Sequence, residues 1–272
     1  HIVYNGVTGY DESMKKLLAI VVLGLLLASC TQQNRNDEYI CKFSSGKKPQ
    51  EDITNVVYPN EESNIQSNRW YQLMGFEPVS PFLPGGRSNG LTQLDAFKAN
   101  INDYDATRNY PHLNKTSWLS PYIRFGCISI REMVHLANSY KSAGAHIWLT
   151  ELVWRDFYQM VAATHPNCDT TAIKPIYDTI KWEGKGEWLN AWKDGQTGFP
   201  IIDAAMRELN QTGLMHNRCR MITASFLCKT LLIDWREGEA YFAKKLLDFD
   251  FASNNGGWQW SSSSGCDAQP YF

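Results

Sequence analysis

One stretch of the chain, residues 217–224, has the spacing of a ligand-binding wall. Asn217, Arg220, Met221 and Ala224 lie at positions i, i+3, i+4 and i+7, so on a helix they form one stripe. An amide, a guanidinium and a thioether suit a flat polar ligand better than a hydrophobic core. The alternative is the solvated edge of an ordinary helix, and the pattern alone leaves both open.

A second polar segment, residues 248–257, follows the stripe. It contains two Asp, two Asn and two Gly residues, namely Asp248, Asp250, Asn254, Asn255, Gly256 and Gly257. This composition is typical of an irregular loop. Such a loop could present carboxylates and amides to a ligand, or its residues could simply form turns.

Helices are expected to position both segments. Pro200 suits the first turn of a helix and Asp203 its positive end, while Gly213 ends it. A second helix is predicted over about residues 216–232, and a third follows Asp234. The first helix should turn one apolar face to the core, formed by Ile201, Ala204, Ala205 and Leu209.

The chain from residue 91 onward has helical spacing almost throughout, and strand alternation is hardly visible. Leu91, Leu94, Phe97 and Ile101 share one face. Further helices are predicted at residues 131–140, 145–163 and 188–193. We therefore predict an all-α fold, a cluster of helices with long loops.

Composition adds few constraints. The 272 residues include 26 Lys and Arg against 28 Asp and Glu, so net charge does not indicate nucleic acid and any basic surface must be local. The seven Cys are odd in number, and no CxxC occurs. A disulfide framework or a zinc site is therefore not expected, and most thiols should be buried in a reduced compartment.

The leader, residues 1–30, has a different character. Two lysines precede an apolar run, residues 17–28, that ends at Cys30. The segment 14–30 resembles a bacterial lipoprotein signal with Cys30 as the lipidated residue, and the run is too short to span a bilayer. A buried helix is the alternative. Residues 31–75 are polar and are expected to form a spacer without a fixed fold.

Several blocks of the chain resemble those of a known family. They are LSPYIRFG at 119–126, ELVWRDFY at 151–158, TGFPIIDAAMR at 197–207, MHNRCRM at 215–221 and NNGGWQW at 254–260. Together they resemble the flavin-binding domain of the DNA photolyase and cryptochrome family, most closely the bacterial cyclobutane pyrimidine dimer photolyases. The resemblance covers about residues 76–272, and this many blocks in order are far more specific than one glycine motif.

The resemblance implies a helical FAD-binding domain at residues 76–272. Family members also carry an N-terminal α/β domain that holds an antenna chromophore, but no βαβ pattern or glycine-rich phosphate loop occurs before residue 90. We therefore expect no antenna chromophore here. The chain does not begin with Met and stops at Phe272, where family members continue. We expect a domain truncated at its C-terminus, in a fragment or in a chimera with a lipoprotein start.

The resemblance also implies which residues hold FAD in a central cavity. The matching positions are Tyr104, Thr116, Ser117, Trp118, Leu119, Ser120, Arg155, Arg220, Asp248, Asp250 and Asn254. Hydroxyl and main-chain N–H groups of residues 116–120 suit phosphate oxygens, although this segment alone could be a helix cap. Arg220 and Asp248 would pair beside the ring. Asn254 would face flavin N5, where a neutral amide tolerates the anionic reduced flavin.

A pyrimidine dimer in a duplex must be flipped into a pocket before it can be repaired. By resemblance, the pocket has two aromatic walls, two contacts to base edges, a thioether beside the dimer and a phosphate contact. The aromatic walls are Trp154 and Trp260, and the contacts to base edges are Glu151 and Asn217. The thioether is that of Met221, and the phosphate contact is Arg218. Glu151 can stabilise an electron-bearing base only if it is protonated or donates through a partner.

Trp258, Trp235 and Trp182 match the family's electron-transfer chain, which runs from the flavin to the surface and reduces oxidised FAD under light. Together with Glu151 and Asn254 they are the predicted catalytic residues. Each of these tryptophans alone could equally be a packing residue, since the chain has 10 Trp.

Light-driven repair of cyclobutane pyrimidine dimers by reduced FAD, the reaction of a deoxyribodipyrimidine photolyase, is the leading hypothesis. It implies damaged DNA as the partner, a monomer without a stable protein partner, no metal and a cytoplasmic location, with which the lipoprotein-like start conflicts. The alternative is a cryptochrome-like blue-light photoreceptor that binds FAD without repair; Glu151, Met221 and Asn254 favour repair. A third hypothesis is a lipoprotein with a non-enzymatic helical domain, against which the flavin motifs argue.

Overall fold

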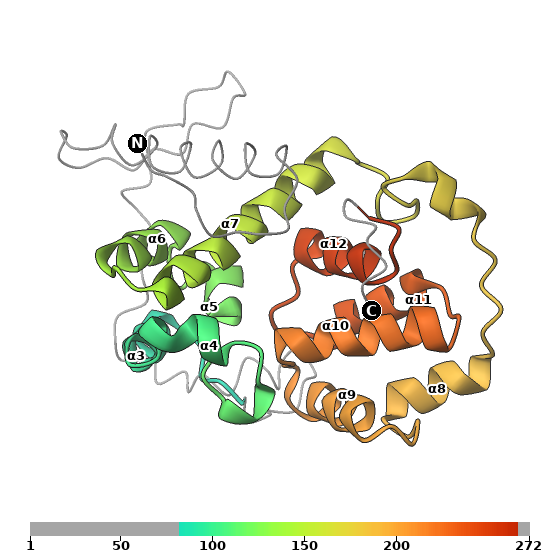
Figure 1. Cartoon of the computed structure of the whole chain (residues 1–272), viewed down its shortest axis with the longest axis horizontal. Helices are drawn as coiled ribbons and strands as arrows, with labels where there is room; N and C mark the ends of the chain where they lie inside the picture. Colours follow the sequence, from blue (N-terminus) through green and yellow to red (C-terminus); the bar gives the residue numbers. More distant parts are fainter. Residues whose placement is uncertain (1–81, 266–272) are drawn as a thin grey trace, which may run out of the picture. The chain divides into compact units, whose positions relative to one another are not determined.

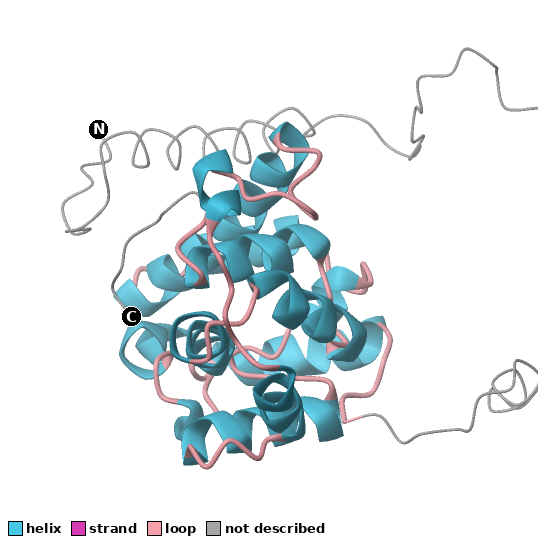
Figure 2. Ribbon diagram, turned by 90° about the vertical axis from the view of Figure 1, so that its right-hand side faces the viewer, coloured by secondary structure: helices cyan, strands magenta, loops and turns pink. Residues whose placement is uncertain are grey.

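The computed structural model describes residues 82–265, and this part of the chain consists of helices and loops without a β-strand (Figures 1 and 2). The all-α prediction is thereby confirmed. The leader 1–30 with its lipoprotein-like segment, the spacer 31–75 and the chain end 266–272 lie outside the described residues. Residues 84–265 belong to one compact unit. Within residues 82–265, no helix is long and apolar enough to cross a membrane.

The first half of the helical region is organised around its longest helix, α7 (Figure 1). The elements are α3 (Arg87–Lys98), η1 (Ile101–Asp103), α4 (Tyr104–Thr107), η2 (Pro111–Leu113), α5 (Ser120–Arg124), α6 (Ile130–Ser139) and α7 (Ala143–Thr164). Helix α7 packs against η1, α4, α6 and the later α12. The core of this half includes the buried residues Phe97, Ile101, Leu119, Met133 and Trp148.

The second half carries the predicted stripe and polar segment. Its elements are η3 (Pro175–Thr179), α8 (Gly186–Asp194), α9 (Pro200–Thr212), α10 (Asn217–Ser225), the π-turn η4 (Phe226–Thr230), α11 (Trp235–Lys245) and α12 (Phe251–Ser261). A second core cluster joins them, with Trp192, Met206, Leu209, Leu227 and Phe242 among its most buried members. The helices predicted around 131–140, 145–163, 188–193 and after Asp234 are thus present as α6, α7, α8 and α11.

Short polar residues set several helix starts. Ser129 and Glu132 form a capping box at α6, in which the Ser129 hydroxyl accepts from the main chain and Glu132 accepts from the N–H of Ser129. Asp234 caps α11 by accepting from the N–H of Arg236. Helix α9 begins at Pro200 and ends before Gly213, which adopts φ +71°, as the sequence predicted.

Two predicted apolar faces are correct only in part. Ala205 and Leu209 of one face and Leu94, Phe97 and Ile101 of the other are buried as predicted, and the remaining members are exposed. In α9 the buried stripe is Ile202, Ala205, Met206 and Leu209, whereas Ile201 is 52% exposed and Ala204 is also exposed. In α3 Gly90 is buried and Leu91 is exposed. Both helices contain two overlapping stripes with helical spacing, and the packing partners decide between them. Gly90 lies so close to Ile128 and Tyr122 that a Cβ would come within 3.0 Å of both side chains.

The predicted loop at 248–257 is wrong in its second part, because residues 251–261 form α12. Asp250 caps this helix by accepting from the N–H and hydroxyl of Ser253. Gly256 is required by close packing, since a Cβ there would lie 2.1 Å from the Tyr158 ring in α7. Asn255 donates to the carbonyl of Cys168 at 2.8 Å. The Asn and Gly residues therefore serve tertiary contacts of a helix and not turns.

The predicted helix 216–232 is regular only as far as Ser225. His216 caps α10 by accepting from the N–H of Arg218 through Nδ1. The π-turn η4 then follows and places Leu227 and Cys228 in the core. Cys228 and the other cysteines of the described part, Cys127, Cys168 and Cys219, are free thiols.

Candidate functional site

A cavity of about 130 Å³ lies between α10, α11, α12 and the loop before α12. All four residues of the predicted stripe, Asn217, Arg220, Met221 and Ala224, line it. The remaining lining residues are Phe242, Leu246, Asp248, Asp250, Ser253, Asn254, Gly257, Trp258 and Ser261. The stripe is therefore a cavity wall rather than a solvated edge. The structure also brings Arg220, Asp248 and Asn254 together, as the sequence analysis expected.

The deepest polar feature of the cavity is the Arg220–Asp248 pair. Arg220 Nη2 donates to both oxygens of Asp248, at 2.8 and 3.1 Å, and the Asp248 side chain is only 2% exposed. Ser120 Oγ, at the start of α5, donates to Asp248 Oδ2 at 2.6 Å. Arg220 Nε donates to the carbonyl of Met215. These bonds compensate two charges that could not be buried singly.

The side-chain amide of Asn254 is hydrogen-bonded to Glu239 of α11. Its amide nitrogen donates to Glu239 Oε1 at 2.9 Å and to the Glu239 carbonyl at 3.2 Å. Burial raises the pKa of Glu239, and the hydrogen bond from Asn254 opposes this shift. The amide that lines the cavity therefore has a fixed orientation. Sequence analysis missed Glu239, because nothing in its spacing connects it to a residue fifteen positions later.

A second polar cluster lies where α4, α7 and α10 meet, and we call it the base-side cluster. Arg108 Nη1 donates to Glu151 Oε1 at 2.6 Å. Arg218 donates to Asn109 Oδ1 at 2.5 Å and to the Met221 sulfur at 3.3 Å. Met221 belongs to both the cavity and this cluster, so the two are continuous. Arg218 therefore contacts Asn109 and Met221 of the base-side cluster.

Burial raises the pKa of Glu151, and the nearby charges of Arg108 and then Arg218 oppose that shift. Tyr104, under the guanidinium of Arg108, is also buried, and burial raises its pKa further above the ordinary range. Arg108 and Asn109 were missed by sequence analysis. They follow directly after the four-residue helix α4, and their partners lie 43 and 109 residues away, so no periodicity indicates them.

Of the other predicted cofactor residues, Asp250 also lines the cavity, and the rest lie outside its lining. Ser120 reaches it through Asp248, and Thr116 and Ser117 lie in the loop before α5. Trp118 in that loop has φ +54° and donates through its indole to Asn114. Leu119 is 1% exposed and packs in the core, so only its main chain could meet a ligand. Arg155 donates to the neighbouring Asp156 at 3.4 Å.

The predicted aromatic residues divide into two groups. Trp258 lines the cavity and packs edge-on against Phe242, with ring centres 5.0 Å apart. Trp235 is buried and Trp182 is half-buried against the same core cluster, so exposure rises from Trp258 and Trp235 to Trp182. The half-buried Trp154 and Trp260 lie outside the cavity lining, and Trp154 packs against Phe157 and Tyr158.

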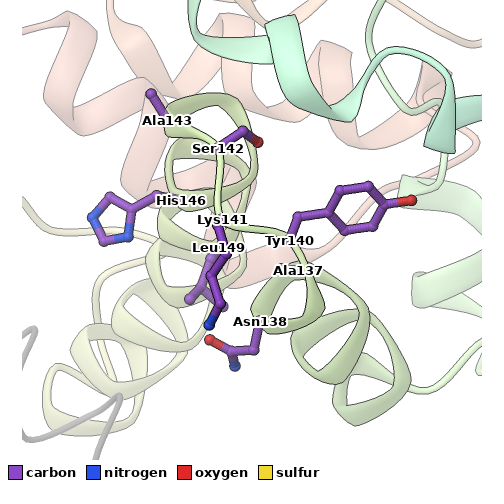
Figure 3. Close-up of a pocket in the computed structure, with 8 residues that line it drawn as sticks. All are labelled: Ala137, Asn138, Tyr140, Lys141, Ser142, Ala143, His146 and Leu149. Atoms are coloured by element: carbon purple, nitrogen blue, oxygen red, sulfur yellow. The ribbon is translucent and has the colours of Figure 1, made fainter.

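A separate hollow lies between the end of α6 and the start of α7 (Figure 3). Its volume is about 390 Å³, and Tyr140, Lys141, Ser142 and His146 supply its polar lining. None of the predicted site residues lines it.

Comparison with known proteins agrees with this geometry. Residues 148–272 match the family described as FAD binding domain of DNA photolyase. The deoxyribodipyrimidine photo-lyase of Vibrio cholerae is 49% identical over an alignment of 189 residues, and this alignment covers 65% of this chain and 39% of that protein. The Escherichia coli photo-lyase is 47% identical over an alignment of 189 residues, and this alignment covers 67% of this chain and 40% of that protein. The resemblance to the DNA photolyase and cryptochrome family is confirmed.

Solved structures of photolyases and a cryptochrome have the same helical arrangement. An archaeal photolyase from Sulfolobus tokodaii with two FAD molecules matches 74% of this chain with 40% identity and a TM-score of 0.67. A class III photolyase from Agrobacterium tumefaciens gives 37% identity and a TM-score of 0.69 over 74% of this chain. A Synechocystis cryptochrome matches 72% of this chain with 33% identity and a TM-score of 0.66. These matches cover 45%, 44% and 44% of the solved chains, so this chain spans less than half the length of its relatives.

The residues present fit a flavin. The cavity is below the roughly 300–1,000 Å³ of ordinary ligand sites, so it suits a ring system and not a whole dinucleotide. Its lining offers donors from Arg220, acceptors from Asp248 and a fixed amide from Asn254. Ser120 and the loop before α5 extend the polar surface beyond the cavity, where a phosphate chain would have hydroxyl groups.

Proposed function

We propose that this chain carries the FAD-binding domain of a deoxyribodipyrimidine photo-lyase, which repairs cyclobutane pyrimidine dimers in DNA with light. The observation that supports this most is the continuity between the Arg220–Asp248–Asn254 cavity and the base-side cluster through Met221. A cofactor site and a substrate site must lie close together if an electron is to pass quickly between them. The named relatives, which are photo-lyases, support the same proposal.

When bound, reduced FAD supplies the light absorption and the electron for dimer cleavage. Arg220 and Asp248 orient the ring and stay neutral as a pair, so the site binds it without a net buried charge. Asn254 offers a neutral amide whose orientation Glu239 fixes, which tolerates negative charge on the ring better than a carboxylate would. Residues 104, 116–120, 155 and 250 would complete the cofactor contacts.

The dimer would be flipped out of the duplex, at a cost of a few kcal/mol that is smaller for a damaged pair. Met221 and Asn217 would contact it on the cavity side, and Glu151 would meet a base edge. Trp154 and Trp260 would stack against the bases, and Arg218 would approach a phosphate. The damaged DNA is the proposed partner, which implies action in the cytoplasm.

Trp258, Trp235 and Trp182 would carry electrons to oxidised FAD. Trp258 is next to the cavity and Trp182 is the most exposed of the three, which is the order such a path requires. A cryptochrome-like photoreceptor is less well supported, because a receptor has no need of the base-side cluster.

The test uses the chain loaded with FAD and a single-stranded oligonucleotide that contains one thymine dimer. We expect tighter binding to this oligonucleotide than to the undamaged one, and loss of the dimer under blue light but not in the dark. FAD binding without preference for the dimer and without repair would overturn the proposal in favour of a photoreceptor.

A further inference from the structure

Arg108 forms an ion pair with Glu151, whose carboxyl group is the one that would bind the substrate in the proposed function. Arg108 Nη1 and Glu151 Oε1 are 2.6 Å apart, which is a short, charge-assisted bond. The two side chains are 24% and 28% exposed, so neither is fully hydrated. An ionised carboxylate only accepts hydrogen bonds, so Glu151 cannot bind a base carbonyl, which also only accepts, while it keeps its charge.

The ionisable groups that act on Glu151 come from two helices around α7. Arg108 and Tyr104 belong to α4 and its end, and Arg218 belongs to α10. Helix α12, which also packs against α7, has no ionisable residue. Helix α6 and η1 contribute none of the charges that act on Glu151. The carboxyl group is therefore governed by burial and by two arginines.

We propose that Arg108 is a positioning residue that sets the protonation state of Glu151. While no dimer is bound, the guanidinium keeps the carboxyl ionised. When a dimer binds, a base carbonyl replaces Arg108 at the carboxyl, and Glu151 takes up one proton from solvent and donates it as a hydrogen bond to that carbonyl. This inference rests on the proposed function, since it needs a dimer in the pocket.

The energetics favour this exchange. A buried carboxylate without a partner is costly, and such a group neutralises instead by a rise of its pKa. Burial already raises the pKa of Glu151, and Arg108 provides the largest opposing effect. Loss of Arg108 as partner therefore raises this pKa further. A neutral carboxyl also suits a base that receives an electron, because a carboxylate would repel the added charge.

The sign of the pH dependence follows from linkage. The dimer-bound state has the higher carboxyl pKa and so holds more protons. Dimer binding is therefore strengthened as pH falls and weakened as pH rises between the two pKa values of Glu151. The limiting slope is about tenfold in affinity per pH unit for one proton.

The experiment counts protons taken up on binding. The FAD-loaded chain is titrated in the dark with the dimer-containing oligonucleotide, by calorimetry in buffers of different ionisation enthalpy. We expect about one proton per dimer for the parent chain, none for Glu151→Gln, and well below half of the parent value for Arg108→Gln, in which the loss of the guanidinium raises the pKa of Glu151 before the dimer binds. Arg131→Gln, which removes an exposed charge on α6, is the matched control and should keep the parent value.

Two results would overturn the inference and leave the proposed function standing. One is preferential binding of the dimer without proton uptake by the parent chain. The other is equal uptake by the parent, Glu151→Gln and Arg108→Gln chains. A parent chain that binds damaged and undamaged oligonucleotides alike would overturn both the inference and the proposed function.

Discussion

The candidate site contains two arginine–carboxylate pairs, and they differ in how firmly they are held. In the Arg220–Asp248 pair the carboxylate is 2% exposed and accepts from Arg220 through both oxygens and from Ser120. In the Arg108–Glu151 pair one bond joins two partners that are each about a quarter exposed. The first arrangement suits a permanent part of a cofactor site. The second suits a contact that a substrate can replace.

The largest expected difference between the pairs is in stability. Asp248→Asn should lower the free energy of unfolding by about 3 kcal/mol, the lower end of the range for a broken buried pair, because Arg220 stays partly exposed. Glu151→Gln should cost less, about 1 kcal/mol, because the Glu151 carboxylate is 28% exposed against 2% for Asp248 and its charge is already disfavoured by burial. Urea denaturation of both variants measures the difference. Equal losses would remove the distinction between the pairs.

The hydroxyl of Ser120 provides a smaller test of the same contrast. Ser120→Ala removes one charge-assisted bond to Asp248 and should cost about 1.5 kcal/mol, with weaker retention of FAD. Asn109→Ala removes an exposed bond to Arg218 and should change stability by less than about 0.5 kcal/mol. Denaturation and FAD release on dilution measure both effects. If the Asn109→Ala chain lost FAD more readily than the Ser120→Ala chain, the assignment of Ser120 to the cofactor site and of Asn109 to the base-side cluster would be contradicted.

The smallest effect concerns the pH dependence of stability. The folded-state pKa of Glu151 is raised by burial above its unfolded value, so the folded chain holds more protons and stability falls as pH rises through that interval. Arg108→Gln raises the folded pKa further, so its stability should fall over a wider pH interval, and by a larger total amount, than that of the parent. Glu151→Gln should remove this contribution. Parallel pH profiles for all three chains would show that Arg108 does not act on Glu151.

Much of the fold could be predicted from apolar spacing. Helices α6, α7, α8 and α11 were predicted within a few residues, because their patterns have the helical period and clear ends. Helix α12 was missed because its Asn and Gly residues were interpreted as turn formers. In the structure they bind the Cys168 carbonyl and allow contact with Tyr158, which are partners that local composition does not show.

The site shows the same limit. The stripe from Asn217 to Ala224 was recognised because all its members share one helix face; its pattern left a ligand-binding wall and a solvated edge open, and in the structure it lines the cavity. Arg108 and Glu239 were missed because each acts on a side chain from another helix. One face of a helix can be predicted from spacing, whereas a bond between helices depends on their packing.

The most direct test of the account is the number of dimers that remain after blue light, measured for three FAD-loaded chains with chemically reduced cofactor. The parent and Trp258→Phe chains should remove dimers at similar rates, because the repair electron does not use the tryptophan path. Met221→Glu should remove almost none, because an unpaired charge in the pocket disfavours binding of an uncharged pyrimidine dimer. Repair by the Met221 variant at the parent rate would show that the dimer does not bind where the cavity and the base-side cluster meet.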